Sequence, residues 1–346
     1  MSLIARYGGI YGHIPMYMGR VFFVSPAATY VIDGRTFPAS DNHDGLHPER
    51  ALRTINQAIT NAAANAGDVI LCLEGTHTVT AAINVNKAGL TFWGVHSGPT
   101  TINLYQPRTI VTSTGTSAPT WNINAANTDI AFLDIRPTTL YSAFSFQTGD
   151  AALNGFYLHH CHVDLETPAV ARTTVGVDFG YRASGTFGSG SFGPSGKGVA
   201  TTEVISNVLI EDCVFESDGA QGEGIVLASC YATVRRCHFY SSAGTWATPF
   251  RVATSTDNSL IQDCVWTTTA TMSLAIDGAL ADVAGGVRIT DCRFNVSSGA
   301  NAAQVDQMAS IRGFGTSEAV VMQCFTGGSV NELMASPYGM IARMVG

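Results

Sequence analysis

The feature of this sequence that most restricts its fold is a short cysteine-centred segment that recurs along the second half of the chain. The copies read YLHHCHV, LIEDCVF, VRRCHF, LIQDCVW, RITDCRF and VVMQCF. Successive cysteines are 52, 24, 27, 28 and 32 residues apart. Self-similarity at intervals of roughly 20 to 50 residues is typical of proteins built from stacked repeats. The six cysteines are Cys161, Cys213, Cys237, Cys264, Cys292 and Cys324.

One unit of the repeat indicates how the chain runs. Cys213 and Phe215 are two residues apart and therefore share one face of a strand. Ile210 lies three residues before Cys213, so it shares that face only if the chain bends at Glu211 and Asp212. Each unit is thus predicted to be a strand, a tight bend and a second strand. The inward pairs are Cys213 with Phe215, Cys237 with Phe239, Cys264 with Trp266 and Cys292 with Phe294, and the equivalent bend positions are Asp134, His160, Arg236, Asp263, Asp291 and Gln323.

The same register extends towards the N-terminus. The segment IAFLDIR places Ile135 26 residues before Cys161, and LTFWGV places Val95 another 40 residues upstream. Because the step of 52 residues from Cys161 to Cys213 equals two steps of 26, we expect one further repeat between them, with VGVDFGYR from Val175 as its strand. The predicted ladder begins at Val95 and runs through all six cysteines, with one residue for each turn of a parallel β-solenoid.

The recurrent cysteines are predicted to be structural. Cysteine is among the residue types most often buried, and it packs as a small apolar side chain. Eight cysteines in 346 residues are too few for a disulfide scaffold, and the sequence holds no C-x-x-C pair of the kind found in zinc ribbons and thioredoxins. We expect the ladder cysteines to be buried, unpaired and stacked on one another.

Composition narrows the classes of protein further. Charged residues make up 13% of the chain and apolar residues 46%, which excludes intrinsic disorder and long charged helices. A net charge of -8 gives no electrostatic footprint for nucleic acid. No apolar run is long enough to span a membrane, and the first 24 residues lack the continuous apolar core of a signal peptide. The expected place of synthesis is the cytoplasm.

The open end of a solenoid core needs a cap, and one segment of this sequence is suited to form it. Between Pro48 and Gly67, which suit a helix start and stop, the residues at 48–65 predict a helix of about four to five turns. Its apolar face would hold Leu52, Ile55, Ile59 and Ala62. The predicted organisation is an N-terminal docking arm at 1–24, a leading strand, turn and capping helix at 25–67, the solenoid at 68–328 with a Gly/Ser-rich loop at 183–200, and an apolar tail at 329–346.

The stretch SDNHDGLHPERALRTINQAITNAA, followed by GDVILCLEGTHT, resembles the opening of right-handed parallel β-helix proteins of the pectin-lyase-like class. The likeness continues through the xxDCxF segments and covers roughly residues 40–328. It is greatest to the β-helix proteins of tailed bacteriophage particles. The resemblance implies an all-β fold: a single-stranded right-handed parallel β-helix with one N-terminal capping helix. It implies little about activity, because one fold carries many functions.

Enzymes of this class use recognisable catalytic patterns. Its lyases use calcium held by aspartates with an Arg or Lys base, and its hydrolases use clustered acids in N-T-D, D-D, G-H-G and R-I-K segments. In this sequence only Asn127-Thr128-Asp129 matches by letters. The aspartates at the bends could form acid pairs across neighbouring turns, but stabilisation of the bend is the simpler interpretation.

Two other segments resemble metal sites. Residues 41–45, DNHDG, offer oxygens for calcium but lack the full EF-hand pattern, so a hydrogen-bonded turn is preferred. Residues 159–162, HHCH, suggest zinc, but the repeat directs Cys161 inward and His162 outward and leaves the other two at the bend. The G-x-G-x-x-G at 188–193 has no helix after it, which argues against dinucleotide binding. We therefore predict no catalytic residue, no metal site and no cofactor.

Both ends of the chain are apolar and poor in charge. Six of the nine methionines lie in the first 18 or the last 13 residues. Exposed apolar segments usually mark interfaces, and methionine adapts to irregular surfaces. We predict that the arm docks on other particle subunits or on sister copies, in a homotrimer; the alternative is that both tails cover the solenoid ends of a monomer. The candidate interface residues are Arg6, Tyr7, Tyr11, Met16, Tyr17, Met18 and Arg20 in front and Tyr338, Met340 and Met344 behind.

Two classes of function follow from these observations. The first is a non-enzymatic structural protein of a bacteriophage virion: a capsid decoration, a spike or fibre, or a tail-associated spike, with host surface glycans as a further ligand. The second is a β-helix that binds or degrades polysaccharide, as tailspike lyases and hydrolases do. A secreted adhesin is disfavoured by the lack of a signal peptide pattern. Neither nucleic acid nor a membrane is an expected partner.

Overall fold

The computed structural model describes residues distributed along the chain from 19 to 343. They are 19–97, 106–114, 119–137, 142–146, 153–165, 174–178, 205–217, 222–227, 230–241, 246, 249–252, 259–268, 276–281, 287–296, 311–314, 320–322, 325–327 and 342–343. Residues 1–18, the loop at 183–200, Cys324 and most of the C-terminal tail lie outside the described residues.

Three long parallel sheets make up most of the fold, which confirms the predicted all-β class. The first sheet has the strand order β1 (Val21–Val24), β4 (Val69–Cys72), β7 (Thr91–Gly94), β12 (Asp129–Ala131), β15 (Tyr157–His159), β18 (Ile205–Glu211), β21 (Cys230–Arg235), β24 (Leu260–Gln262), β27 (Arg288–Thr290), β30 (Val320–Met322) and β32 (Ala342–Arg343). The second sheet has β5 (Gly75–Val79), β10 (Thr109–Ser113), β13 (Leu133–Pro137), β16 (His162–Asp164), β19 (Val214–Ser217), β22 (His238–Ser241), β25 (Val265–Thr268), β28 (Arg293–Val296) and β31 (Phe325–Gly327). The third has β6 (Ile83–Val85), β11 (Trp121–Ile123), β14 (Phe144–Phe146), β17 (Thr174–Asp178), β20 (Gly222–Leu227), β23 (Phe250–Val252), β26 (Ile276–Ala281) and β29 (Ile311–Phe314).

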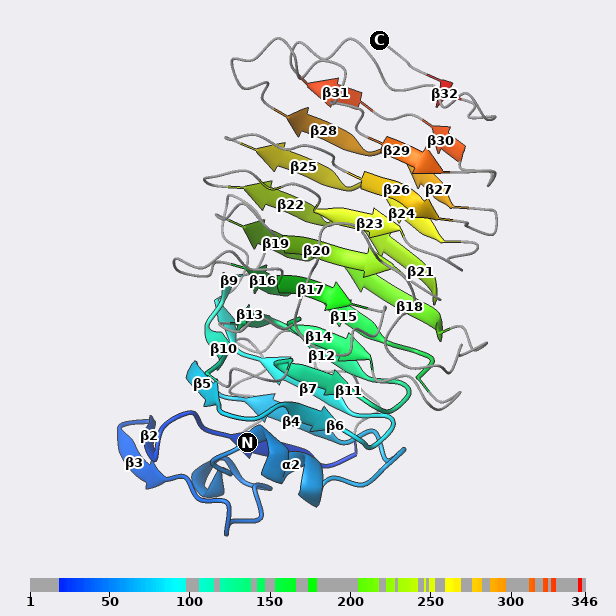
Figure 1. Ribbon diagram of the computed structural model, residues 1–346. Coiled ribbons are helices and arrows are strands. Elements are labelled where there is room, and N and C mark those ends of the chain that lie inside the picture. The colour runs from blue at the N-terminus through cyan, green and yellow to red at the C-terminus, as the bar shows by residue number, and fades with distance from the viewer. Residues whose placement is uncertain are drawn as a thin grey trace.

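The chain visits the three sheets in turn. From β4 to β31, a strand of the first sheet is followed by one of the second and one of the third, after which the chain returns to the first sheet. A short antiparallel hairpin, β8 (His96–Ser97) with β9 (Gln106–Pro107), interrupts one of these passages. We call three such successive strands a rung. Figure 1 shows the rungs stacked in chain order, an arrangement that is compatible with a β-solenoid.

A residue with a positive φ angle stands between the first-sheet and second-sheet strands of six consecutive rungs. This is the bend that the three-residue spacing predicted, because it lets both Ile210 and Cys213 point into the core, where each is fully buried. Aspartate and histidine tolerate this left-handed conformation better than most side chains, which accounts for four of the six residues. The corner residues are Phe132, His160, Asp212, Arg236, Asp263 and Asp291, with φ angles between 51° and 57°.

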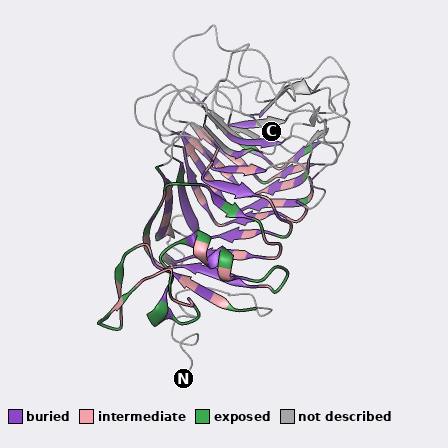
Figure 2. Ribbon diagram, turned by 60° about the horizontal axis from the view of Figure 1, so that its bottom comes forward, coloured by how far each residue is buried: buried purple, intermediate pink, exposed green. Residues whose placement is uncertain are grey.

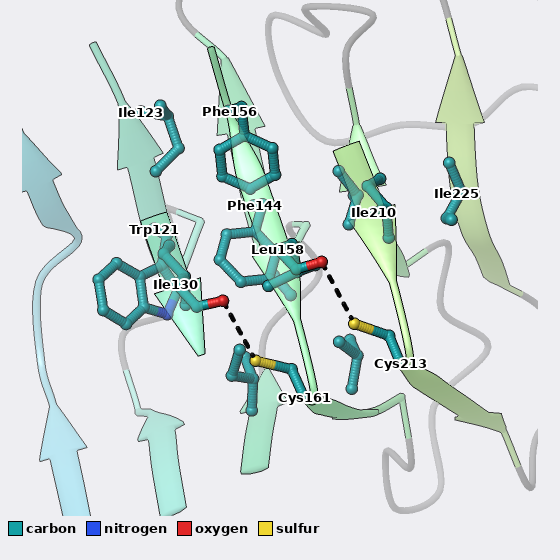
Figure 3. Close-up of a cluster of buried hydrophobic side chains, with 14 of the residues drawn as sticks. Trp121, Ile123, Ile130, Phe144, Phe156, Leu158, Cys161, Ile210, Cys213 and Ile225 are labelled. Carbon is teal, nitrogen blue, oxygen red and sulfur yellow. Dashed lines mark hydrogen bonds between the residues drawn. The ribbon is translucent and has the colours of Figure 1, made fainter. Parts of the chain in front are cut away.

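The corner residues are followed by two rows of inward side chains. The first row contains the cysteines, and the second row contains the aromatic rings. The rings in the second row lie face to face, with centroids 5.2 Å apart for Phe215 and Phe239 and 5.0 Å apart for Phe239 and Trp266. Strand pairing places Phe294 level with Trp266 in the next rung. In the first row, the Cys161 and Cys213 thiols donate to backbone carbonyls of the preceding rung (Figure 3). The cysteines of this row that the structure describes are buried and form no disulfide: Cys161, Cys213, Cys237, Cys264 and Cys292.

The structure contradicts the further repeat expected between Cys161 and Cys213. Strand β15 pairs directly with β18, and β16 with β19, so the two cysteines belong to consecutive rungs. The segment that includes Val175 is β17, the third strand of the Cys161 rung, and it pairs with β14 and β20. The step of 52 residues is therefore one rung enlarged by a long insertion between 178 and 205, not two rungs of ordinary length.

The predicted ladder is also out of register upstream of Cys161. Strand pairing places Ile135 level with Val163, and Val163 level with Phe215, so Ile135 belongs to the aromatic row. Asp134 lies on strand β13 and not at a bend. The error arises because Phe132 occupies the corner of this rung, and phenylalanine gives no turn signal in a sequence.

Val95 does not belong to the ladder at all. It is buried in a second apolar cluster with Trp93, Leu71 and Phe132, apart from the main core that contains Cys161. Along β7, Phe92 faces the main core and Trp93 faces the second cluster, so the second cluster lies on the outer face of the first sheet. Gly94, the residue directly before Val95, does not have a positive φ angle, so no corner turns the Val95 side chain inward.

The N-terminal cap is less helical than predicted. The structure has a 3-10 turn, η1 (Pro48–Arg50), and a seven-residue helix, α2 (Ile55–Asn61), in place of one helix over 48–65. Between them Leu52 forms a parallel bridge with Val24 of β1, and these backbone hydrogen bonds hold the chain extended. The apolar residues that suggested a longer helix are nevertheless all buried: Leu52, Ile55, Ile59 and Ala62.

An antiparallel hairpin, β2 (Thr29–Ile32) with β3 (Arg35–Pro38), projects from the same end of the molecule (Figure 1). Its turn residues Asp33 and Gly34 both have positive φ angles, as a two-residue hairpin turn of type I′ requires. Figure 2 brings this end forward and shows buried residues along the strands and exposed residues on the hairpin and α2.

Part of the predicted arm belongs to the folded body. Val21–Val24 forms β1, which pairs in parallel with β4, so the boundary predicted at residue 24 is wrong. Arg20, counted among the interface residues, forms an ion pair with Asp68, with 2.9 Å between Nη2 and Oδ2. Its backbone N–H also donates to Asp68 Oδ1 at 2.7 Å, which anchors the start of β1 beside β4.

Replacing Cys264 by aspartate tests the cysteine row. Cys264 is fully buried, and burial raises the pKa of its thiol well above the ordinary value. A carboxylate at this position would have neither water nor a partner, so we expect Cys264→Asp to lower the free energy of unfolding by at least about 4 kcal/mol. Cys264→Ala, the matched control, should cost only about 1–2 kcal/mol. Urea unfolding measures both, and similar small losses would contradict the buried row.

Candidate functional site

Ionisable side chains gather along one edge of the molecule, where the first sheet turns into the second. Because neighbouring strands lie about 4.8 Å apart, outward side chains at equivalent positions contact each other across rungs. We call this set the charged corner. On the first-sheet side and at the corner itself it contains Asp129, Tyr157, His159, His160, Glu211, Asp212, Arg235 and Arg236, and on the second-sheet side Asp134, Arg136, His162, Asp164 and Glu216.

Glu211 is the centre of the first-sheet side. Its side chain is only 7% exposed, and it accepts hydrogen bonds from the Tyr157 hydroxyl and from the guanidinium groups of Arg235 and Arg236. Burial alone would raise the pKa of Glu211, but Arg235, Tyr157 and Arg236 hold it at about 2. Burial and the Glu211 charge together raise the pKa of Tyr157 well above its ordinary value. Glu211 is therefore ionised and Tyr157 protonated at neutral pH.

A second ion pair joins two corner residues of consecutive rungs. Arg236 donates to Asp212 through two nitrogens, with 2.7 Å from Nε to Oδ1 and 2.7 Å from Nη2 to Oδ2. This two-point geometry is the most favourable arrangement for an arginine and a carboxylate. Arg236 also bonds Glu211, so one guanidinium holds the acids at two adjacent positions.

His162 is the centre of the second-sheet side. Its Nδ1 lies 3.2 Å from Asp134 Oδ1 and its Nε2 lies 3.1 Å from Glu216 Oε2, so the imidazole bridges two carboxylates. Arg136 closes the network, with Nη2 2.6 Å from Asp134 Oδ2 and Nε 3.6 Å from Asp164 Oδ2. Burial opposes the charge, yet Asp134 and Glu216 raise the pKa of His162 to about 9.

The acids of this network are held in their ionised form. Burial would raise the pKa of Asp134, but His162 and Arg136 lower it overall, and His162 lowers the pKa of Glu216. A general acid needs a pKa near the working pH, which for a carboxyl means an upward shift. Glu211, Asp134 and Glu216 are shifted in the opposite direction. Their arrangement suits ion pairing between rungs better than proton donation to a substrate.

The aspartates that the sequence suggested as acid candidates lie in this part of the molecule, in different rungs. Asp129 is on the outward face of β12, and its Oδ1 lies 3.1 Å from His159 Nε2. Asp212, Asp263 and Asp291 are corner residues with positive φ, which is the bend role proposed for them, and Asp212 is also paired with Arg236.

The oxygens of the DNHDG turn at 41–45 are used in hydrogen bonds within the cap. Asp41 Oδ1 accepts from the backbone N–H groups of Arg53 and Thr54 at 2.9 Å, and Asp44 Oδ1 accepts from Leu46 N–H at 3.1 Å. In the HHCH segment, Cys161 is turned into the core and the three histidines bind different carboxylates. Within the described ranges, no group of three or more His, Cys, Asp or Glu side chains is placed to hold a metal ion.

The remaining predicted interface residues lie outside the described residues. They are Arg6, Tyr7, Tyr11, Met16, Tyr17, Met18, Tyr338, Met340 and Met344. Their predicted role in docking stays a prediction.

The sequence analysis missed the networks around Glu211 and His162. The signal that could have found the first is the register itself, because Glu211 and Arg235 each stand two residues before a cysteine of the row and so lie level with one another. For the second, the register error upstream of Cys161 placed Asp134 at a bend and hid its position level with His162.

Comparison of the chain with protein-family models, with curated proteins and with solved structures gave no match. Among the residues that the structure describes, no helix is long and apolar enough to cross a membrane.

The pKa of His162 predicts a loss of stability at alkaline pH. Because the folded value of about 9 lies above the ordinary 6.5, the protonated imidazole stabilises the fold fully below about pH 6.5. This contribution should disappear as the pH rises through 9, by about 2–3 kcal/mol. Urea unfolding between pH 6.5 and 9.5 measures it. His162→Gln should remove this part of the pH dependence, whereas His47→Asn, at an exposed histidine of the cap, should keep it.

Proposed function

We propose that this chain is a right-handed, single-stranded parallel β-helix that serves as a non-enzymatic structural protein of a tailed bacteriophage particle. The order in which the chain visits the three sheets supports the β-helix, and the connections between parallel strands of one sheet are right-handed in about 98% of proteins. The phage assignment is supported by the resemblance of residues 40–328 to β-helix proteins of phage particles. A capsid decoration, a spike or fibre, and a tail-associated spike all fit this role.

The observation that carries the structural role is the way the outward acids are used. Glu211, Asp212 and Asp134 each bind a basic side chain, and Glu211 and Asp212 are linked to Arg236 of the next rung. Ion pairs that join consecutive rungs stiffen the stack along its length. The same pairs leave Glu211 and Asp134 with lowered pKa values, which does not favour acid–base catalysis.

We propose that the protein is made in the host cytoplasm, joins the virion through its terminal segments and forms a homotrimer, with host surface glycans as a further ligand. Apolar termini with few charges support assembly with other proteins of the particle.

Sedimentation of virus particles tests the structural role. We expect the chain to co-sediment with purified virions in a density gradient, at a constant ratio to the major capsid protein and after washing in high salt. A protein found only in the lysate supernatant would contradict the proposal and favour the alternative of a polysaccharide-degrading β-helix.

The second candidate is a β-helix that binds or degrades polysaccharide. One observation favours it: the rings of Tyr157 and His159 are stacked at 4.1 Å on the outer face, beside the carboxylates of Asp129 and Glu211. Paired carboxyls are the machinery of glycoside hydrolysis.

Incubation with host surface polysaccharide decides between the two. We expect the purified protein to release no oligosaccharides, with or without calcium. The Glu211 carboxyl is held ionised, so it cannot donate the proton that a general acid supplies. Steady release that is lost in Glu211→Gln or Asp129→Asn, and kept in the exposed control Glu49→Gln, would overturn the non-enzymatic role.

A further inference from the structure

A buried histidine occupies the N-terminal end of the aromatic row. His77 lies on β5, the strand at that edge of the second sheet. Strand pairing places His77 level with Val111 of the next rung, and Val111 level with Ile135 of the aromatic row. The imidazole therefore points into the core, and His77 is only 3% exposed. It is the one end of the row that the N-terminal cap, and not another rung, must cover.

One nitrogen of the His77 ring has a hydrogen-bond partner. Nε2 lies 2.9 Å from the backbone oxygen of Leu73, and because a carbonyl can only accept, Nε2 carries the proton. Nδ1 has no hydrogen-bond partner among the described residues, so it is the atom that a further proton would bind. Burial lowers the pKa of His77 to about 4, since the Leu73 hydrogen bond opposes this decrease only in part and the charge of Arg53 adds to it. The ring is therefore neutral in the folded protein at neutral pH.

The charge that interacts with the His77 ring comes from the cap. Arg53 donates through Nη1 to the backbone oxygens of Ser25, at 3.2 Å, and of Pro26. These two bonds hold the guanidinium in place, so it cannot move away when the ring becomes charged. A protonated His77 and Arg53 would then place two positive charges across the boundary between the cap and the first rung.

No carboxylate within the described part of the chain balances these charges at His77. The acid closest to His77 along the chain is Glu74, and it is already paired with Arg108, with 2.6 Å between Oε1 and Nη2. A buried cation without a counterion is unfavourable, because burial removes its hydration. Protonation of His77 therefore requires that water reach the ring.

The cap offers the easier route for that water. On the side of the next rung, β5 pairs with β10 over its whole length, from Gly75 to Val79. On the other side β5 is the last described strand of its sheet, and it lies against the cap at Pro26. A Cβ atom added to Gly75 would come within 2.9 Å of Pro26 Cγ, which shows how closely the two segments pack. Moving the cap breaks no strand pairing of β5, whereas separating the rungs breaks all of it.

We propose that His77 is an acid-sensitive lock of the N-terminal cap, residues 25–67: a proton on Nδ1 releases the cap from the first rung while the later rungs stay folded. The closed cap resists this proton, whereas an open cap lets the imidazole titrate at its ordinary value of 6.5. The closed state is thus most stable above pH 6.5 and loses stability as the pH falls from 6.5 towards 4. The lock does not depend on the role proposed for the protein in a phage particle.

His77→Gln is the variant that removes the lock and keeps its hydrogen bond. The Nε2 amide of glutamine can donate to the Leu73 carbonyl as the imidazole Nε2 does, and it does not titrate. His47→Asn is the matched control, because it removes an exposed histidine of the cap where asparagine preserves the N-terminal hydrogen bond of η1.

Urea unfolding of the three proteins at pH 7 and pH 5 tests the titration. Between these values we expect the folding equilibrium constant of the wild type and of His47→Asn to fall about twentyfold more than that of His77→Gln. The other histidines, His162 included, titrate in the wild type and in His77→Gln alike, so their contributions cancel in this comparison. An equal pH dependence of His77→Gln and the wild type would overturn the lock.

Hydrogen exchange of the wild type tests the release of the cap and does not depend on the variant folding. After correction for the intrinsic pH dependence of exchange, the opening equilibrium constant of peptides from residues 25–67 should be about twenty times larger at pH 5 than at pH 7. Peptides that contain β22 and β25 should remain protected at pH 5. A cap opening constant that is the same at both pH values, or a cap as well protected at pH 5 as β22 and β25, would contradict the proposal.

Discussion

Parallel hydrogen bonding between consecutive rungs is the constraint on which the rest of this structure depends. The residue after a cysteine of the row donates its N–H to the carbonyl of the cysteine in the preceding rung. The distance from N to O is 2.9 Å for Val214 to Cys161 and for His238 to Cys213. This pairing fixes the register, so equivalent positions lie above one another. Each inward position must then hold side chains that pack on copies of themselves, and cysteine and flat aromatic rings do so.

The same constraint acts on the outer surface with the opposite chemistry. Equivalent outward positions carry charges, and like charges level with one another would repel. Glu211 lies level with Arg235, and Asp134 lies level with His162, so that at both positions an acid has a basic neighbour in the next rung. The resulting ion pairs leave Glu211 with a lowered pKa and His162 with a raised one. The charged corner is thus the outer counterpart of the cysteine row.

The spacing of the cysteines predicted the register correctly wherever the rungs have nearly equal length, from Cys213 to Cys292. It failed across the long insertion before Cys213, because length alone cannot distinguish one enlarged rung from two. It failed again at Phe132, where an aromatic side chain takes a corner that aspartate usually fills. The ion-pair networks were not predicted, because Tyr157 and Glu211 are 54 residues apart and meet only through the stacking of rungs.

Crosslinking of corner residues tests the stacking most directly. Asp263 and Asp291 occupy the corners of consecutive rungs, so their Cα atoms should lie about 5 Å apart, within the range that a disulfide spans. The double variant Asp263→Cys/Asp291→Cys is therefore expected to form an intramolecular disulfide under mild oxidation, detected by mass spectrometry after proteolysis. Asp212→Cys/Asp291→Cys, whose corners are three rungs apart, should form none. Crosslinking of the distant pair, or failure of the adjacent pair in a folded protein, would contradict the stacked rungs.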